Sequence, residues 1–238
     1  MRQIILAINA LLKFKAYTLI NVLGLACSLA CVLTVARYIH QENTVNQCFP
    51  EYKRICLIKT STSSGENFLG GYRSGLEKNP DVEQFTVIYQ ISDMPVLFGE
   101  QEIAANAFSV DSTFFKIFPY RVIAGSGRIV RPRDVVITRS FWMKKLGGKN
   151  AIGATFKNTK GNKFTIVGVV DDPDTKTSWT PDIFMSNELD EFLFFDPIYA
   201  MLMASDADIA LLNKKYSKEH PRSKWSTYET VRYQYLPL

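Results

Sequence analysis

A run of twenty-one residues without a charged side chain, from Ala16 to Ala36, dominates the hydrophobic pattern of the chain. As a helix rising about 1.5 Å per residue, it would extend about 30 Å, the thickness of a bilayer's hydrocarbon core. Lipid offers no partners for backbone polar groups, so a single spanning segment must be helical. The pattern therefore predicts a transmembrane helix at residues 16–36.

Two processed forms compete with a retained helix. A cleaved secretory signal has a shorter apolar core and a small-x-small cleavage site, and no such site follows this run. A lipoprotein signal would place an acylated cysteine where Cys27 follows Leu25-Ala26, but the uncharged run continues for nine residues beyond it. We therefore expect the helix to be retained as an anchor.

The residues that flank this run predict its surroundings. Residues 1–15 form an amphipathic segment, which we expect to lie at the cytoplasmic interface as an elbow, although it could also extend the membrane helix inward. Its apolar stripe consists of Ile4, Ile5, Ile8, Leu11 and Leu12. Arg2, Lys13 and Lys15 precede the run, and Arg37 is the only Lys or Arg in the fifteen residues after it. This bias favours a cytoplasmic N-terminus, with the remainder of the chain outside the inner membrane.

Small and polar residues within the run predict where another helix could pack. Gly24 and Ser28 are four positions apart, and Asn21 precedes Gly24 by three, so all three share one helix face. Small side chains let backbones approach closely in lipid. We therefore predict Asn21, Gly24 and Ser28 as candidate helix-packing residues.

Beyond the anchor, residues 41–238 show alternating strand and helix signals typical of an extramembrane α+β domain. About two hundred residues suffice for one sizeable core or two small lobes, and we expect two lobes. The predicted strands are 52–60, 82–89, 94–98, 102–110, 120–124, 135–138, 163–170, 182–185 and 230–236. The predicted helices are 67–78, 111–118, 139–146, closed by Gly147-Gly148, and 205–216.

Composition narrows the function classes. The net charge is +5 and the basic residues are scattered, without the clusters and interleaved aromatics of a nucleic-acid-binding protein. Four cysteines do not make a disulfide framework. Cys27 and Cys31 lie in the predicted span, whereas Cys48 and Cys56 lie in a compartment that permits a bridge. A Cys48–Cys56 disulfide and two free thiols both remain open.

No motif predicts catalysis, a cofactor or a metal. Gly148-Lys149-Asn150 lacks the Ser or Thr that ends a phosphate-binding loop, and Met143 stands where its first glycine should be. His40 and His220 have no partners at ligand spacing. Two further groups of residues have structural interpretations. We interpret an acidic group as a solvated turn, and an aromatic group as core packing, although the aromatic group could also form a partner- or substrate-facing patch. They are the acidic group Asp171, Asp172, Asp174 and Asp182, and the aromatic group Phe114, Phe115, Phe118, Phe141 and Trp142.

Four stretches, in this order and spacing, carry a family resemblance. The chain resembles the N-terminal half of MacB/FtsX-type ABC transporter permeases, particularly the variety found in Bacteroidetes. The stretches are NVLGLA at residues 21–26, FSVDSTFFKIF at 108–118 with Gly125 after it, DVVITRSFWMKKLGGKNAIGATF at 134–156, and FTIVGVVDD at 164–172 with Pro173, Ser178 and residues 182–184. Ala151 and Trp179 depart from the family pattern, which often has proline and histidine there.

The resemblance implies one membrane helix, a MacB-like periplasmic core domain and three further membrane helices. No second run of spanning length occurs here, so we interpret the chain as a segment cut at the domain boundary or a truncated gene product. The implied function is a non-catalytic permease subunit in efflux, lipoprotein handling or cell-envelope control. The implied partners are an ABC ATPase subunit, a second permease copy or homologue, periplasmic proteins and inner-membrane lipid. The alternative hypothesis is a single-span sensor or ligand-binding protein, and an anchored extracytoplasmic enzyme ranks below both.

Overall fold

The computed structural model describes residues 13–62, 67–69, 79–148, 150–188, 197–216, 220–221 and 230–238. The chain divides into two compact units, Met1–Val45 and Asn46–Leu238. Residues 1–12 of the predicted elbow lie outside the described residues.

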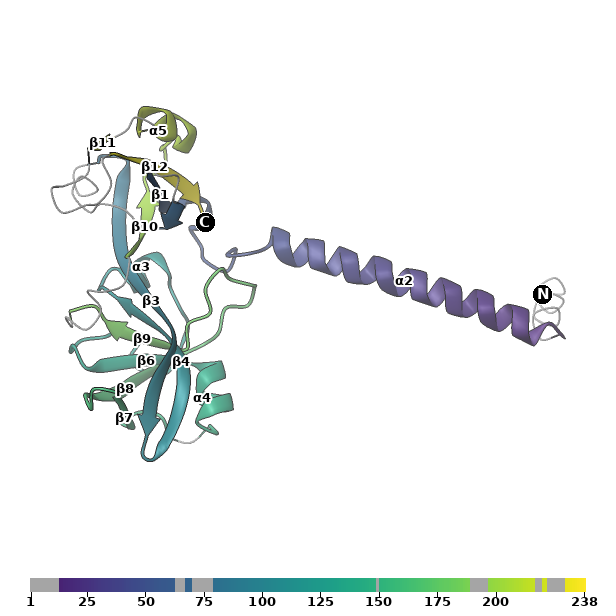
Figure 1. Cartoon of the computed structure of the whole chain (residues 1–238), viewed down its shortest axis with the longest axis horizontal. Helices are drawn as coiled ribbons and strands as arrows, with labels where there is room; N and C mark the ends of the chain where they lie inside the picture. The colour runs from purple at the N-terminus through teal and green to yellow at the C-terminus, as the bar shows by residue number, and fades with distance from the viewer. Residues whose placement is uncertain are drawn as a thin grey trace. The chain divides into compact units, whose positions relative to one another are not determined.

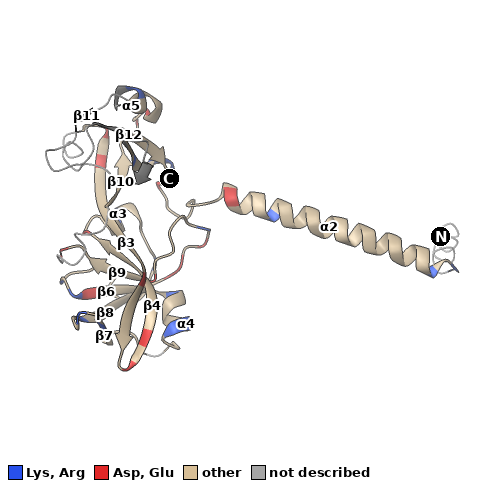
Figure 2. Ribbon diagram, in the orientation of Figure 1, with Lys and Arg blue, Asp and Glu red and all other residues tan. Residues whose placement is uncertain are grey.

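The first unit contains one long helix, α2, which runs from Lys15 to Asn43 and is long and apolar enough to cross a membrane. It carries charge only towards its two ends (Figure 2). It extends seven residues beyond the predicted end at Ala36. Charged and polar residues end the apolar run there, but none of them is glycine or proline, so nothing in residues 37–43 breaks a helix.

The second unit is built on one mixed sheet (Figure 1). Its described strands follow the order β11-β12-β1-β10-β3-β4-β9-β6-β8-β5; β2 also pairs with β1, and β7 pairs with β3 and β8. Most neighbours are antiparallel, but β4 runs parallel to β9, and β6 parallel to β8. The strands are β1 (Ile55–Thr62), β2 (Asn67–Leu69), β3 (Val82–Phe98), β4 (Gln101–Val110), β5 (Val122–Gly125), β6 (Asp134–Thr138), β7 (Thr155–Asn158), β8 (Lys163–Val170), β9 (Ile183–Ser186), β10 (Ile198–Met203), β11 (His220–Pro221) and β12 (Thr230–Pro237). The helices are η1 (Tyr52–Arg54), α3 (Phe114–Ile117), α4 (Arg139–Lys145) and α5 (Ile209–Tyr216).

This architecture confirms the predicted α+β class. The two predicted lobes correspond to the two ends of one sheet, because the 17-residue strand β3 serves both. Its first half pairs with β10, and its second half pairs with β4 and β7. The core falls into three apolar clusters, of which the largest is rich in aromatic side chains: Phe49, Phe108, Phe114, Phe118, Trp179 and Phe184.

Several predicted elements need correction. Residues 67–69 form strand β2 against β1 instead of starting a helix, and 70–78 lie outside the described residues. Strands β7, β10 and β11 have no predicted counterpart, and residues 52–54, predicted as the start of a strand, form the 3-10 helix η1. Cys48 and Cys56 are both free thiols. The hairpin about Gly99 is confirmed, as is the glycine stop of α4, where the Gly148 N–H donates to the Trp142 carbonyl at 3.1 Å.

Candidate functional site

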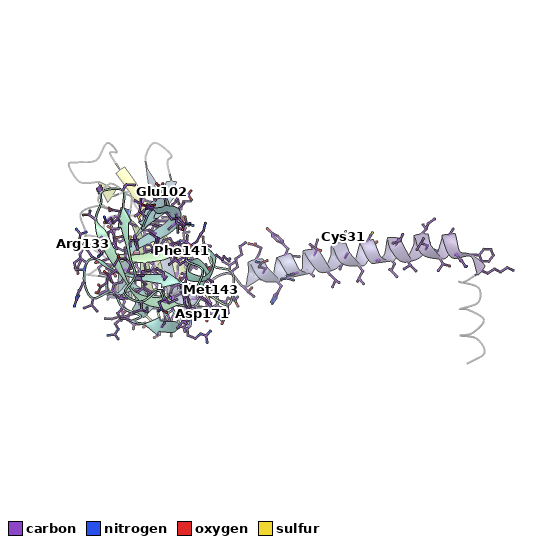
Figure 3. The ribbon with its side chains drawn as sticks, turned by 90° about the horizontal axis from the view of Figure 1, so that it is seen from below. Cys31, Glu102, Arg133, Phe141, Met143 and Asp171 are labelled. Atoms are coloured by element: carbon purple, nitrogen blue, oxygen red, sulfur yellow. The ribbon has the colours of Figure 1, made fainter. Side chains whose placement is uncertain are left out.

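The three predicted helix-packing residues lie exposed on α2. The Ser28 hydroxyl donates to the Gly24 carbonyl at 2.9 Å, so its polarity is satisfied within the helix. A Cβ added at Gly24 would meet no atom within 4 Å. Cys31 projects from the same helix (Figure 3). The face is thus open to another helix, and its packing role stays a prediction.

Asn46, three positions after the end of α2, forms several hydrogen bonds within the domain. Asn46 has a left-handed φ of 64° and is 4% exposed. Its amide Nδ2 donates to Ser178 Oγ at 2.8 Å, and its Oδ1 accepts from the Ser178 N–H at 2.8 Å. The Asn46 N–H also donates to the Lys176 carbonyl at 2.8 Å. This one residue therefore bonds both backbone and side chain of a segment far away in the sequence.

Phe49 adds an apolar anchor just after Asn46. Its ring is 3% exposed and lies 5.0 Å from the Phe118 ring and 5.9 Å from that of Tyr120, both in edge-to-face geometry. Beside it, burial raises the pKa of the Cys48 thiol. Burial also raises the pKa of Tyr120, because the charged phenolate would lose its water. The junction segment, residues 46–52, thus enters the aromatic cluster directly.

The segment from Asp171 to Asp182, here called the strap, forms hydrogen bonds with Asn46 of the junction segment and connects it to the sheet. Asp171 pairs with Arg121 and, at 3.3 Å, with Arg139. The hydrogen bond from Arg121, followed by that from Arg139, lowers the pKa of the Asp171 carboxyl. Asp172 accepts from the N–H and the hydroxyl of Ser140, at 2.9 and 2.6 Å, in the first turn of α4.

The far end of the strap is fixed to two strands. Asp182 Oδ2 accepts from the Asn106 N–H at 2.9 Å, and the Asp182 N–H donates to the Asn106 carbonyl at 2.8 Å. The Asp182 carbonyl accepts from the Thr138 N–H at 3.0 Å. The prediction of a solvated turn is therefore wrong for Asp171, Asp172 and Asp182, whose carboxylates hold the strap in place. Within the described residues, no group of three His, Cys, Asp or Glu side chains could hold a metal ion.

The predicted aromatic residues behave as core. Phe114, Phe118 and Phe141 are buried, and Phe115 and Trp142 are partly buried. No sequence pattern indicated a role for Asn46, because a single asparagine after a membrane run resembles an ordinary helix stop. Ser178 stands within the fourth family-like stretch, but its partner could not be deduced from spacing.

Comparison with known proteins places this geometry in a family. The family model described as "MacB-like periplasmic core domain" matches residues 18–215. The fold is similar to a domain of a protein assigned as a permease from Porphyromonas gingivalis, with 19% identity and a TM-score of 0.63 over 80% of this chain and 93% of that one. It is also similar to the periplasmic region of MacB from Actinobacillus actinomycetemcomitans, with 14% identity and a TM-score of 0.55 over 72% of this chain and 83% of that one. No curated protein matches the sequence. With its family match, its fold and the helix α2 in agreement, the chain belongs to the MacB-like periplasmic core domain family.

Proposed function

We propose that the chain is a non-catalytic permease component of an ABC transporter. Its domain would move in response to ATP hydrolysis by a separate cytoplasmic subunit, in efflux, lipoprotein handling or cell-envelope control. The Lys and Arg residues before α2 support an inner-membrane location with the N-terminus in the cytoplasm and the domain in the periplasm.

The observation that carries the proposal is the attachment of Asn46. A movement of α2 is transmitted along the covalent chain, and Asn46 is the first residue after the helix that bonds to the strap. The strap in turn bonds to α4 through Asp172 and to β4 through Asp182. Displacement of the helix would thus reach both ends of the strap and, through Trp179, the aromatic cluster of the core.

The end of β12 supports the same function. The Leu238 N–H donates to the Ile55 carbonyl at 2.9 Å, and Leu238 packs against the aromatic cluster that holds Phe49. In the family that the chain resembles, the segment after the domain returns to the membrane. A membrane connection after Leu238 would therefore act on the same aromatic cluster as the junction segment.

The test is hydrogen exchange on the full chain in lipid nanodiscs, alone and with an ABC ATPase subunit that binds it. We expect ATP with vanadate to change exchange in the strap only when the ATPase is present. Asn46→Ala should remove that change and leave ATP hydrolysis intact. Asn187→Ala, a partly buried asparagine away from the junction segment, is the matched control.

Two results would contradict the proposal at different levels. An unchanged strap response in Asn46→Ala would exclude the Asn46 route. Hydrolysis of ATP by the chain alone, or a domain indifferent to ATP in the presence of an active ATPase, would exclude the function itself.

A further inference from the structure

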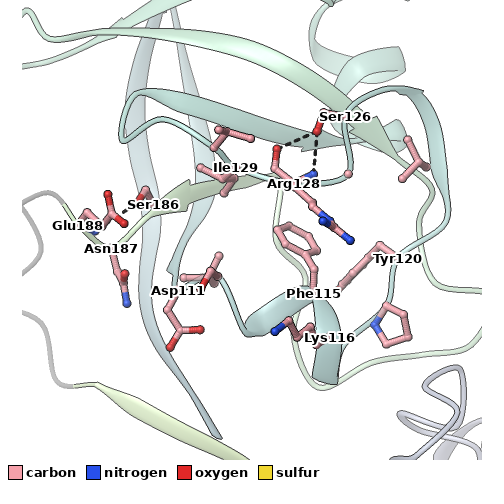
Figure 4. A pocket seen from close by; sticks show the side chains of 16 residues that line it. Asp111, Phe115, Lys116, Tyr120, Ser126, Arg128, Ile129, Ser186, Asn187 and Glu188 are labelled. Carbon is pink, nitrogen blue, oxygen red and sulfur yellow. Dashed lines mark hydrogen bonds between the residues drawn. The ribbon is translucent and has the colours of Figure 1, made fainter. Parts of the chain in front are cut away.

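A cavity of ≈ 670 Å³ opens where β4 and β9 end (Figure 4). The two strands are parallel, and Val110 and Ser186, their last residues, both line it. From there the chain continues into α3 on one side and to Asn187 and Glu188 on the other. Crevices beyond the carboxyl ends of parallel strands, where the connections diverge, are common ligand sites, and the volume lies in their usual range of about 300–1,000 Å³.

The cavity has a preformed aromatic floor made by Phe115 and Tyr120. Both rings pack on Phe184, a fully buried residue of the core, with centroids 5.3 and 5.1 Å away. The floor is therefore the outer side of a packed aromatic cluster, and a ligand would not have to order it.

Two uncommitted cations line the cavity, one on either side of Phe115 (Figure 4). Lys116 and Arg128 line the cavity and are exposed, and their side chains have no ion-pair or hydrogen-bond partner among the described residues. Asp111 is already occupied, because its carboxylate accepts from the Thr86 hydroxyl, the Val87 N–H and the Thr113 N–H. Glu188 lies across the cavity from Arg128 (Figure 4). The aromatic floor therefore has a free cation near each of its edges, with Arg128 beside Phe115 and Tyr120 (Figure 4).

The loop that presents Arg128 is rigidly built. Ser126 Oγ donates to the Arg128 carbonyl at 3.0 Å and accepts from the Arg128 N–H at 3.1 Å. The Ser126 N–H donates to the Val167 carbonyl at 2.8 Å. This close approach to β8 requires two glycines. A Cβ at Gly125 would lie 2.2 Å from the Val167 carbonyl oxygen, and one at Gly168 would lie 1.7 Å from that of Ser126.

The geometry points to a binding site for a small amphipathic carboxylate. Its apolar body lies on Phe115 and Tyr120, and its carboxylate pairs with Arg128, since a guanidinium matches a carboxylate in geometry and charge. Lys116 adds a second positive charge on the other side of Phe115. The site does not depend on the proposed transport function.

The test is calorimetric titration of the full chain in detergent micelles, with protein-free micelles as the blank. The probes are 4-phenylbutyrate, its uncharged analogue 4-phenylbutanamide, and inorganic phosphate. We expect saturable binding of 4-phenylbutyrate only. Arg128→Gln should weaken it about tenfold, as the loss of a charge-assisted hydrogen bond predicts. Arg131→Gln, an exposed arginine of the same loop that does not line the cavity, should leave it unchanged.

Equal binding of the amide would overturn the role of the cations, and equal binding of phosphate would overturn that of the aromatic floor. Absence of saturable 4-phenylbutyrate binding, or an equal loss in Arg128→Gln and Arg131→Gln, would overturn the site. None of these outcomes bears on coupling to an ATPase.

Discussion

Replacing Gly168 with alanine should separate strand β8 from the loop that contains Ser126 and Arg128, here called the Ser126 loop. The added Cβ would lie 1.7 Å from the Ser126 carbonyl oxygen and 2.8 Å from its carbon. Both are backbone atoms, so no change of side-chain rotamer relieves the overlap. Ordinary contact requires about 3.4–4 Å, and the loop must therefore move by well over 1 Å.

The expected loss of stability combines two costs. Overpacking in a well-packed site costs about 1–3 kcal/mol. The displaced loop also loses the hydrogen bond from the Ser126 N–H to Val167, worth about 1 kcal/mol. We therefore expect Gly168→Ala to lower the free energy of unfolding by about 3 kcal/mol. Gly99 is the control: it has a φ of 64° and open space around it, so Gly99→Ala should cost only the left-handed backbone strain, about 1–2 kcal/mol.

The assay is urea unfolding of the full chain in detergent, followed by tryptophan fluorescence, to which the buried Trp179 contributes. A Gly168→Ala loss no larger than that of Gly99→Ala would refute the reasoning. It would show that the loop shifts away from β8 at little cost.

Three further predictions concern charge, thiol reactivity and assembly. Arg121 lowers the pKa of Asp171 in the folded state, so the ionised carboxylate stabilises the fold above pH 3.8, its ordinary pKa. That stabilisation is lost as the pH falls through the lower pKa of the folded state. In urea unfolding, acidification should therefore reduce the free energy of unfolding less in Arg121→Gln than in the wild type. Burial raises the pKa of Cys56 to about 11, so iodoacetamide at pH 8 should alkylate it in urea but not in the native chain, as read by mass spectrometry. Gly24→Leu should reduce disulfide cross-linking through Cys31 in membranes, and unchanged cross-linking would exclude packing on this face.

The sequence predicted the elements that carry a local signal. Residues 163–170 form β8 as predicted, because five of the eight are β-branched and most are apolar. In contrast, β10 has six consecutive buried residues and no alternation, so its apolar run carries no periodic signal. The strand at 67–69 exists because β1 lies beside it, a long-range cause that propensity does not contain.

The functional features were harder to predict for the same reason. Gly125 and Gly168 belong to the family-like stretches of the sequence. The reason that both positions require glycine is the short distance between two backbone segments, which the sequence does not show. Asn46 acquires its role only when residues 176–178 fold against it. Asp171 and Asp172 looked like a solvated turn until their partners Arg121, Arg139 and Ser140 came into contact with them.

The position of β1 has a consequence for the order of folding. Among the described residues, the sheet partners of Cys56 and Leu57, which follow soon after α2, are residues 200–201 of β10 and 236–237 of β12. Although β2 can pair with the later residues of β1 at once, these first residues of β1 must wait for their partners until nearly the whole domain has been made. Such distant pairings close long loops and fold slowly. Anchoring comes first and closure of the sheet last, so this domain cannot complete its core while it is still being made.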